Sequence, residues 1–166
     1  VMGMLSFKDD DWNRYKRVSH TGTFNGNPLC SAAGIATLTR IADGEPQKQA
    51  NRMAEMLRKR MEQAIDERGV AGCVYGDFSV FHVYLGDCAL RDECYRRICL
   101  NADKERPPEI GRRLAINAIL NGVHLPNRGY DGLVSAVHTE SDIDKTAQAF
   151  GASLETLVEE GALSNK

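Results

Sequence analysis

The clearest pattern in the chain is a run of apolar residues at three- and four-residue steps between Pro46 and Gly69. Charged side chains fill the intervening positions, as on a helix with one buried and one solvated face. The break Asp43-Gly44-Glu45-Pro46 comes before this run, so the helix is expected to begin there and to end near Gly69. The apolar positions are Ala50, Met53, Ala54, Leu57, Met61, Ala64 and Ile65.

Two further helices are predicted towards the end of the chain. Ile110 to Leu120 has a helical pattern and stops at Asn121-Gly122, a typical C-terminal signal. A last helix follows Thr139, which is placed to cap it, with Asp142 three residues on as the acid of a capping box. Its apolar stripe is Ile143, Ala147, Phe150, Leu154, Leu157 and Val158.

The segments between these helices favour strands. Cys73 to Tyr75 and Phe78 to Leu85 are rich in β-branched and aromatic residues, and Gly76-Asp77 predicts the turn that joins them. Val123 to Pro126 and Leu133 to Val137 are expected to form two more strands, and residues 86–109 a loop with one short helix. The order of elements predicts an α+β fold, a small mostly antiparallel sheet with helices on one face.

The N-terminal part of the chain has a different character. Residues 1–20 are polar and irregular, with one possible short helix. From Gly22 the sequence is typical of a turn, after which Asn27 can cap a helix and Pro28 fits its first position. That helix is rich in alanine and glycine, and small side chains allow close approach of another backbone. We therefore expect it to be buried against a sheet or a second subunit.

Composition excludes several classes of function. With 166 residues and a net charge of -2, the chain has no general attraction for nucleic acid or anionic membranes. No apolar run is long enough to cross a bilayer, and the N-terminus does not resemble a signal peptide. The five cysteines lack C-x-x-C spacing, which argues against a disulfide framework and a zinc site, although Cys88, Cys94 and Cys99 are close in sequence. They indicate thiols in a reducing cytosol.

No self-contained catalytic motif is present. The chain has no G-x-S-x-G elbow, no phosphate-binding P-loop and no H-E-x-x-H. Its four histidines are scattered, and structural roles are favoured for His82, inside a predicted strand, and for His138, before the last helix. Asp9 to Asp11 is interpreted as a solvated acidic patch.

One short segment is a candidate phosphate contact. Thr23 lies between glycine-bearing turns just before a capped helix, and its hydroxyl and nearby N–H groups are donors. The start of a helix also favours anions. From these residues alone, a plain helix start without any ligand remains an open alternative.

The same segment carries a resemblance to a known family. Gly22-Thr23-Phe24-Asn25-Gly26-Asn27-Pro28-Leu29, followed by Ala32 to Leu38, resembles a long motif of class III pyridoxal-phosphate (PLP)-dependent aminotransferases, in particular glutamate-1-semialdehyde 2,1-aminomutases. The likeness continues through Arg52 to Leu57, Gly69 to Leu85, Asn121 to Pro126 and Gly132 to Asp144. The strand Leu133 to Val137 lacks the substrate-binding arginine of ornithine- and GABA-type relatives, and Arg128 is a poor substitute, which favours the aminomutase branch.

The resemblance implies a fold, a cofactor and a site. It implies the C-terminal part of the fold type I PLP enzymes: residues 1–42 would end the large PLP-binding domain and residues 43–166 would form the small domain. In this family the enzyme is a homodimer, and Gly22 and Thr23 match residues that bind the PLP phosphate of the neighbouring subunit. The parent enzyme would be cytoplasmic and act on a small amino acid or amine.

The resemblance also implies that no catalytic residue lies in this chain. The family's Schiff-base lysine, and the aspartate that pairs with the pyridinium nitrogen, precede the Gly22-Thr23 element and would precede Val1. Lys8 and Lys16 lack the family's lysine context. We therefore expect the chain alone to be inactive. The alternative is a stand-alone α+β binding or interaction domain without catalysis.

Overall fold

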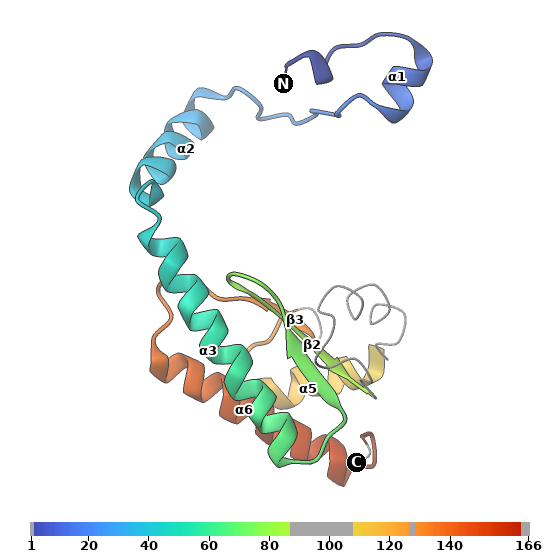
Figure 1. Cartoon of the computed structure of the whole chain (residues 1–166), viewed down its shortest axis with the longest axis vertical. Coiled ribbons are helices and arrows are strands. Elements are labelled where there is room, and N and C mark those ends of the chain that lie inside the picture. The colour runs from blue at the N-terminus through green and yellow to red at the C-terminus, as the bar shows by residue number, and fades with distance from the viewer. Residues whose placement is uncertain (1, 87–107, 127–128, 164–166) are drawn as a thin grey trace. The chain divides into compact units, whose positions relative to one another are not determined.

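The computed structural model describes residues 2–86, 108–126 and 129–163. The chain divides into two compact units, Val1–Asp43 and Gly44–Lys166 (Figure 1). The division falls one residue after the boundary expected from the sequence. The assignment of the two units to a large and a small enzyme domain stays a prediction.

The first unit consists of short helices and turns. Its elements are the 3₁₀ helix η1 (Met2–Met4), α1 (Asp10–Tyr15) and α2 (Pro28–Ile41). The predicted cap of α2 is confirmed, because Asn27 Oδ1 accepts the N–H groups of Leu29 at 2.9 Å and Cys30 at 3.2 Å. The sequence predicted that α2 is buried, but within the described chain α2 has no buried residue.

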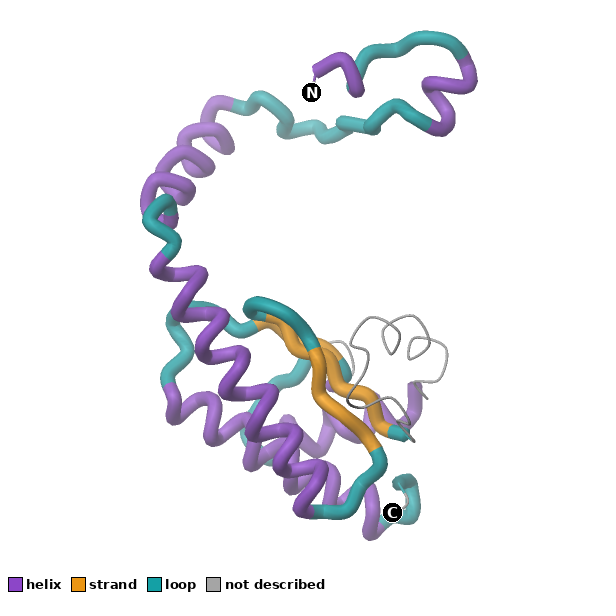
Figure 2. Tube along the Cα trace, in the orientation of Figure 1, coloured by secondary structure: helices purple, strands orange, loops and turns teal. Residues whose placement is uncertain are grey.

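The second unit is a three-stranded antiparallel sheet with helices (Figure 2). Its described elements are α3 (Glu45–Glu67), β1 (Gly72–Tyr75), β2 (Val80–Leu85), α5 (Pro108–Leu120), β3 (Asp131–Leu133) and α6 (Glu140–Glu159). The strands lie in the order β1-β2-β3, with α3 against β1 and β2 and with α6 against both α3 and α5. The predicted α+β class is confirmed, as are the three predicted helices that fall within the described residues. The loop with one short helix predicted for residues 86–109 lies almost wholly outside them.

The prediction of two strands after α5 is wrong in part. Val123 to Pro126 is irregular, and the strand that follows is β3, earlier than expected. The β2–β3 pairing is extended by Val83 N–H donating to the Tyr130 carbonyl at 2.6 Å and Val134 N–H to the Ser79 carbonyl at 2.8 Å. The pairing ends there because the partner strand ends: β2 begins at Val80, and Phe78 and Ser79 belong to the turn before it. The β2 prediction also began too early, since Phe78 and Ser79 lie in the turn.

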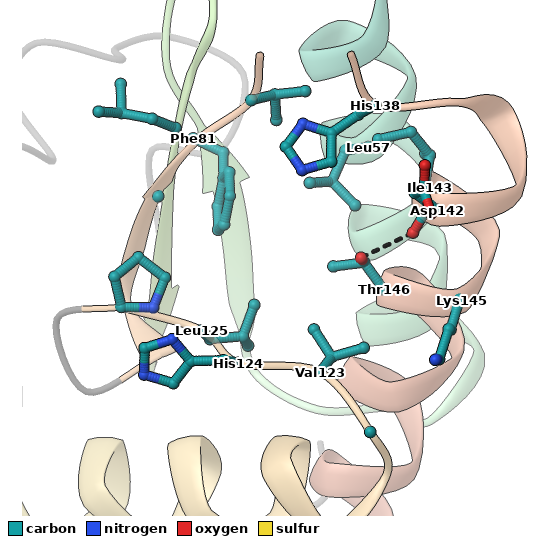
Figure 3. Close-up of a pocket in the computed structure, with 15 residues that line it drawn as sticks. Leu57, Phe81, Val123, His124, Leu125, His138, Asp142, Ile143, Lys145 and Thr146 are labelled. Carbon is teal, nitrogen blue, oxygen red and sulfur yellow. Dashed lines mark hydrogen bonds between the residues drawn. The ribbon is translucent and has the colours of Figure 1, made fainter.

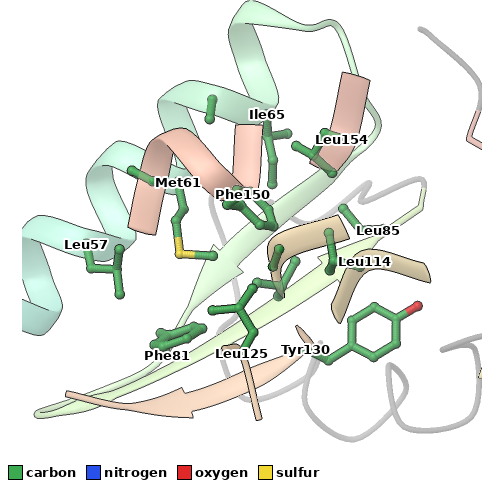
Figure 4. Close-up of a cluster of buried hydrophobic side chains, with 14 of the residues drawn as sticks. Leu57, Met61, Ile65, Phe81, Leu85, Leu114, Leu125, Tyr130, Phe150 and Leu154 are labelled. Carbon is green, nitrogen blue, oxygen red and sulfur yellow. The ribbon is translucent and has the colours of Figure 1, made fainter. Parts of the chain in front are cut away.

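The core of the second unit lies between the helices and one face of the sheet (Figure 4). Every apolar position predicted on α3 is buried, and so are five of the six on α6. Phe81, Val83 and Leu85 alternate along β2 and meet Met61 and Phe150 in this cluster. The opposite face carries a smaller buried cluster of Cys73, Tyr75 and Tyr84.

A close approach between β2 and β3 positions one aromatic ring. A Cβ added at Gly132 would lie 2.4 Å from the Phe81 ring, so only glycine fits at that position without displacing the ring. Gly132 and Phe81 are also cross-strand partners. The ring is thereby fixed beside the segment that follows α5, where it forms one wall of a cavity.

Candidate functional site

The predicted phosphate contact lies in a pair of overlapping turns before α2. Asn25 N–H donates to the Gly22 carbonyl at 3.1 Å, and Asn27 N–H donates to the Phe24 carbonyl at 3.0 Å. Thr23 is exposed at the first turn. Within the part of the chain that the structure describes, neither its hydroxyl nor its N–H has a hydrogen-bond partner. Two adjacent donors are therefore available to a ligand.

These donors fit a phosphate, but the start of α2 contributes less than expected. The N–H groups of Leu29 and Cys30 already donate to Asn27 Oδ1. A capped helix start has fewer orphan donors to offer an anion. An anion at this loop would therefore be bound mainly by the hydroxyl and the N–H of Thr23.

A cavity of about 300 Å³ lies within the second unit (Figure 3). We call it the α6 pocket. Its lining comes from α3, β2, the segment after α5, β3 with the residues after it, and the first turns of α6. The buried apolar part of the lining is Leu57, Phe81, Leu125, Val134 and Ile143. The polar part includes His124, His138, Asp142, Lys145 and Thr146.

Asp142 combines a structural role with a place in the pocket. Its Oδ2 accepts the Thr139 N–H at 2.8 Å and the Thr139 hydroxyl at 2.7 Å, and its own N–H donates to Thr139 Oγ1, which confirms the predicted capping box. These bonds, above all the one from the Thr139 backbone, lower the pKa of Asp142. The Lys145 ammonium and, in its protonated form, the His138 imidazole lower the pKa further and by less. Asp142 is thus ionised at neutral pH.

His138 orders the turn before α6, as predicted. Its Nδ1 accepts the Ser135 N–H at 3.0 Å. An imidazole nitrogen that accepts an N–H bond carries no proton, so the hydrogen-bond network assigns the neutral ring's proton to Nε2. The Nε2–H group is therefore a donor, and His138 lines the pocket.

His82 has the packed role predicted for it. The ring stacks on Tyr75 with centroids 5.0 Å apart, and its Nδ1 lies 2.5 Å from Asp131 Oδ1. It lies in β2, where its neighbours Phe81 and Val83 point into the main core.

Neither lysine of the N-terminal unit is arranged as a buried amine nucleophile. Lys8 Nζ lies 3.7 Å from the centre of the Trp12 ring, and Lys16 forms an exposed ion pair with Asp11 at 3.5 Å. Among the described residues, no three His, Cys, Asp or Glu side chains gather in a way that would hold a metal ion. Cys88, Cys94 and Cys99, and Arg128, lie outside the described residues.

Comparison with known proteins finds relatives that match most of the chain. No family model matches the chain. It is 32% identical over 142 residues to the glutamate-1-semialdehyde 2,1-aminomutase of Methanopyrus kandleri, a match that covers 85% of this chain and 31% of that enzyme. The same enzyme of Archaeoglobus fulgidus is 33% identical over 139 residues, covering 82% of this chain and 31% of the enzyme.

Comparison with solved structures also finds transaminases. The chain superposes on an omega-transaminase from Sphaerobacter thermophilus with a TM-score of 0.65 and 26% identity, covering 89% of this chain and 32% of the transaminase. A transaminase with PLP bound gives a TM-score of 0.67 and 25% identity, covering 90% of this chain and 32% of that one. The chain is thus similar over most of its length to PLP-dependent aminotransferases and to glutamate-1-semialdehyde 2,1-aminomutases. It spans about a third of the length of the curated relatives it matches, 31% in the two cases above.

Similarity to aminotransferases does not by itself assign the site residues. The structure shows Gly22 and Thr23 in an exposed turn, and their contact with a cofactor phosphate stays a prediction. Sequence reasoning missed the α6 pocket. Thr139 and Asp142 were found as a cap, but nothing in the sequence indicated that Lys145 and His138 share a cavity with Phe81. None of the described helices combines the length and apolar character needed to cross a membrane.

Proposed function

We propose that this chain supplies the C-terminal part of a PLP-dependent aminomutase or aminotransferase similar to glutamate-1-semialdehyde 2,1-aminomutase. In this proposal the first unit ends the large domain and the second unit is the small domain of a homodimer. The observation that supports it most is the 32% identity to such an aminomutase over 142 residues. The donors of Thr23, which have no partner among the described residues, add independent support.

The proposed contribution of the chain is to hold the cofactor, not to carry out the chemistry. When bound, PLP acts as an electron sink that stabilises a carbanion on a small amino-acid or amine substrate. Thr23 would donate its hydroxyl, and Gly22-Thr23 its backbone, to the phosphate of the neighbouring subunit. The exposure of this turn agrees with a contact made to another chain. The proposed location is the cytoplasm, where thiols such as that of the exposed Cys30 stay reduced.

The catalytic lysine is proposed to lie outside this chain. Lys8 and Lys16 are each engaged at the surface of the first unit, with Trp12 and Asp11. An unactivated surface amine is a weak nucleophile. Incubating the 166-residue chain with PLP and borohydride should therefore leave no stoichiometric adduct at a single lysine, as judged by peptide mass mapping. One fully labelled lysine would contradict the proposal.

The phosphate contact is tested by substituting Thr23 in the complete enzyme. A hydroxyl that donates to a charged phosphate contributes roughly 1.5–3 kcal/mol, so Thr23→Ala should weaken PLP retention about 10- to 150-fold. Thr23→Ser keeps the hydroxyl and should lose much less. Because the contact is proposed to cross subunits, the defect should grow as the dimer is diluted.

A second threonine offers a matched control. Thr37 in α2 donates its hydroxyl to the Ala33 carbonyl at 2.9 Å, so Thr37→Ala removes a hydroxyl from the same unit without touching the turn. Cofactor dissociation is measured at two protein concentrations. Thr23→Ala should lose PLP faster than the wild type, Thr23→Ser and Thr37→Ala. If Thr23→Ala and Thr23→Ser dissociate alike, the hydroxyl is not the phosphate ligand.

A further inference from the structure

The chain contains two asparagines that are each followed by glycine, in the pairs Asn25-Gly26 and Asn121-Gly122. In such a pair the glycine nitrogen can attack the asparagine side-chain amide, because glycine has no side chain to hinder its approach. Both asparagines lie in exposed turns, and both follow a bulky apolar residue, Phe24 or Leu120. Neighbouring sequence and exposure therefore do not distinguish the two pairs, whereas their hydrogen bonds do.

Asn121 is restrained at both of the groups that would react. Its side-chain Nδ2 donates to the Asn117 carbonyl at 2.8 Å. The Gly122 N–H donates to the Ile119 carbonyl at 2.8 Å, just after the C-terminal end of α5. These two bonds must break before the Gly122 nitrogen can reach the amide carbon, so the helix end protects Asn121.

Asn25 lacks both restraints. Within the described chain, the Gly26 N–H has no hydrogen-bond partner. The Asn25 Nδ2 contacts His20 Nε2 at 3.5 Å, which is longer than the usual N–H bond of about 2.9–3.0 Å. Neither the attacking N–H nor the amide is thus held in place by a short hydrogen bond.

We propose that Asn25 is a site of spontaneous deamidation, and that the product changes the charge of the turn that carries Thr23. The Gly26 nitrogen loses its proton and bonds to Asn25 Cγ, the Cγ–Nδ2 bond breaks, and ammonia leaves. Water then opens the resulting imide ring at either of its carbonyls, which yields aspartate or isoaspartate.

The new carboxylate lies beside the residues proposed to bind phosphate. Asn25 Oδ1 is 2.8 Å from the point where a Cβ on Gly22 would stand, so the side chain is folded over Gly22. A negative charge there repels a phosphate held by Thr23. This consequence rests on the proposed function of the chain: each deamidated subunit weakens the binding of the cofactor.

The modification is tested on the 166-residue chain without PLP, so this test does not depend on the proposed function. The chain is incubated in mildly alkaline buffer, and peptide mass mapping follows the conversion of each asparagine with time. Asn25 should convert about tenfold or more faster than Asn121, because two hydrogen bonds protect Asn121. In guanidinium chloride the two rates should converge, since the protecting bonds are lost. Equal rates in the folded chain, or an Asn25 that does not convert, overturn the proposal.

The consequence is tested in the complete enzyme with two matched substitutions. Asn25→Asp introduces the charge of the product at the turn, whereas Asn121→Asp introduces the same charge at the other pair. Asn25→Asp should retain PLP about three- to tenfold more weakly than the wild type, as expected for a like charge at an exposed site. Asn121→Asp should retain PLP as tightly as the wild type. If Asn25 deamidates but the two variants retain PLP equally, the effect on the cofactor is wrong, and with it the proposed phosphate contact at this turn.

Discussion

Helices α2 and α3 follow one another in the chain, and each has a proline in its first turn, yet only one of them is buried. Seven residues of α3 are buried, whereas α2 has none, and its Leu29, Ile35 and Leu38 are 79%, 67% and 66% exposed. The difference follows from the sequence. Apolar residues of α3 fall on one face, which meets α6 and the sheet, whereas α2 mixes small and apolar residues with no partner in the described chain. A cap can start a helix, but burial needs a second surface.

The largest effect expected from this comparison is in the core of the second unit. Phe150 is fully buried in α6, so Phe150→Ala should lower the free energy of unfolding by about 3–5 kcal/mol. Leu38→Ala in α2 should change it by no more than about 0.5 kcal/mol, because Leu38 has little to lose. Urea unfolding followed by circular dichroism measures both. Comparable losses in the two variants would mean that α2 is packed in solution.

The next effect concerns the two helix caps, which are alike in chemistry and differ in context. Thr139→Ala removes one side of the capping box of α6 and should lower the unfolding free energy of the second unit by about 1 kcal/mol. Asn27→Ala removes the cap of α2 and should reduce helical content without moving that unfolding midpoint. Equal shifts of the midpoint would show that the units unfold together.

Local signals were read correctly from the sequence because they depend on few residues. The cap at Asn27, the box of Thr139 with Asp142 and the apolar face of α3 each depend on spacing within one element. The third strand was misplaced because its limits are set from outside, by the part of β2 that is available to pair with it, Val80 to His82. The α6 pocket needs five separate segments to converge, and no local pattern encodes that.

A smaller effect on stability is expected at low pH. It distinguishes the contribution of the Asp142 carboxylate from that of the rest of the capping box. Hydrogen bonds from Thr139 lower the pKa of Asp142 in the folded chain, so its contribution to stability is complete above about pH 4, the ordinary range of an aspartate. That contribution is lost as the pH falls through the lowered pKa. In Asp142→Asn, the acid-dependent part of the loss should shrink, while Asp144→Asn, whose exposed carboxylate pairs with Arg60, serves as the control. Melting temperatures between pH 2 and 6 measure it, and parallel curves for wild type and Asp142→Asn would refute the assignment.

The smallest effect on stability is expected from the largest change, removal of residues 1–43. The main core cluster contains only residues of the second unit, from Met53 to Leu157, so its unfolding midpoint should not move. Association should change instead, since apolar side chains on α2 are exposed and form a surface that favours contact with another protein. The complete chain should self-associate in light scattering and bind a hydrophobic dye, and both signals should fall in the truncated chain.

Leu29→Gln/Ile35→Gln/Leu38→Gln is the matched variant, because glutamine keeps helix propensity and removes only the apolar surface. If the complete chain is a monomer that binds no dye, α2 is covered within the chain, and the proposal of a subunit contact at this helix loses its basis.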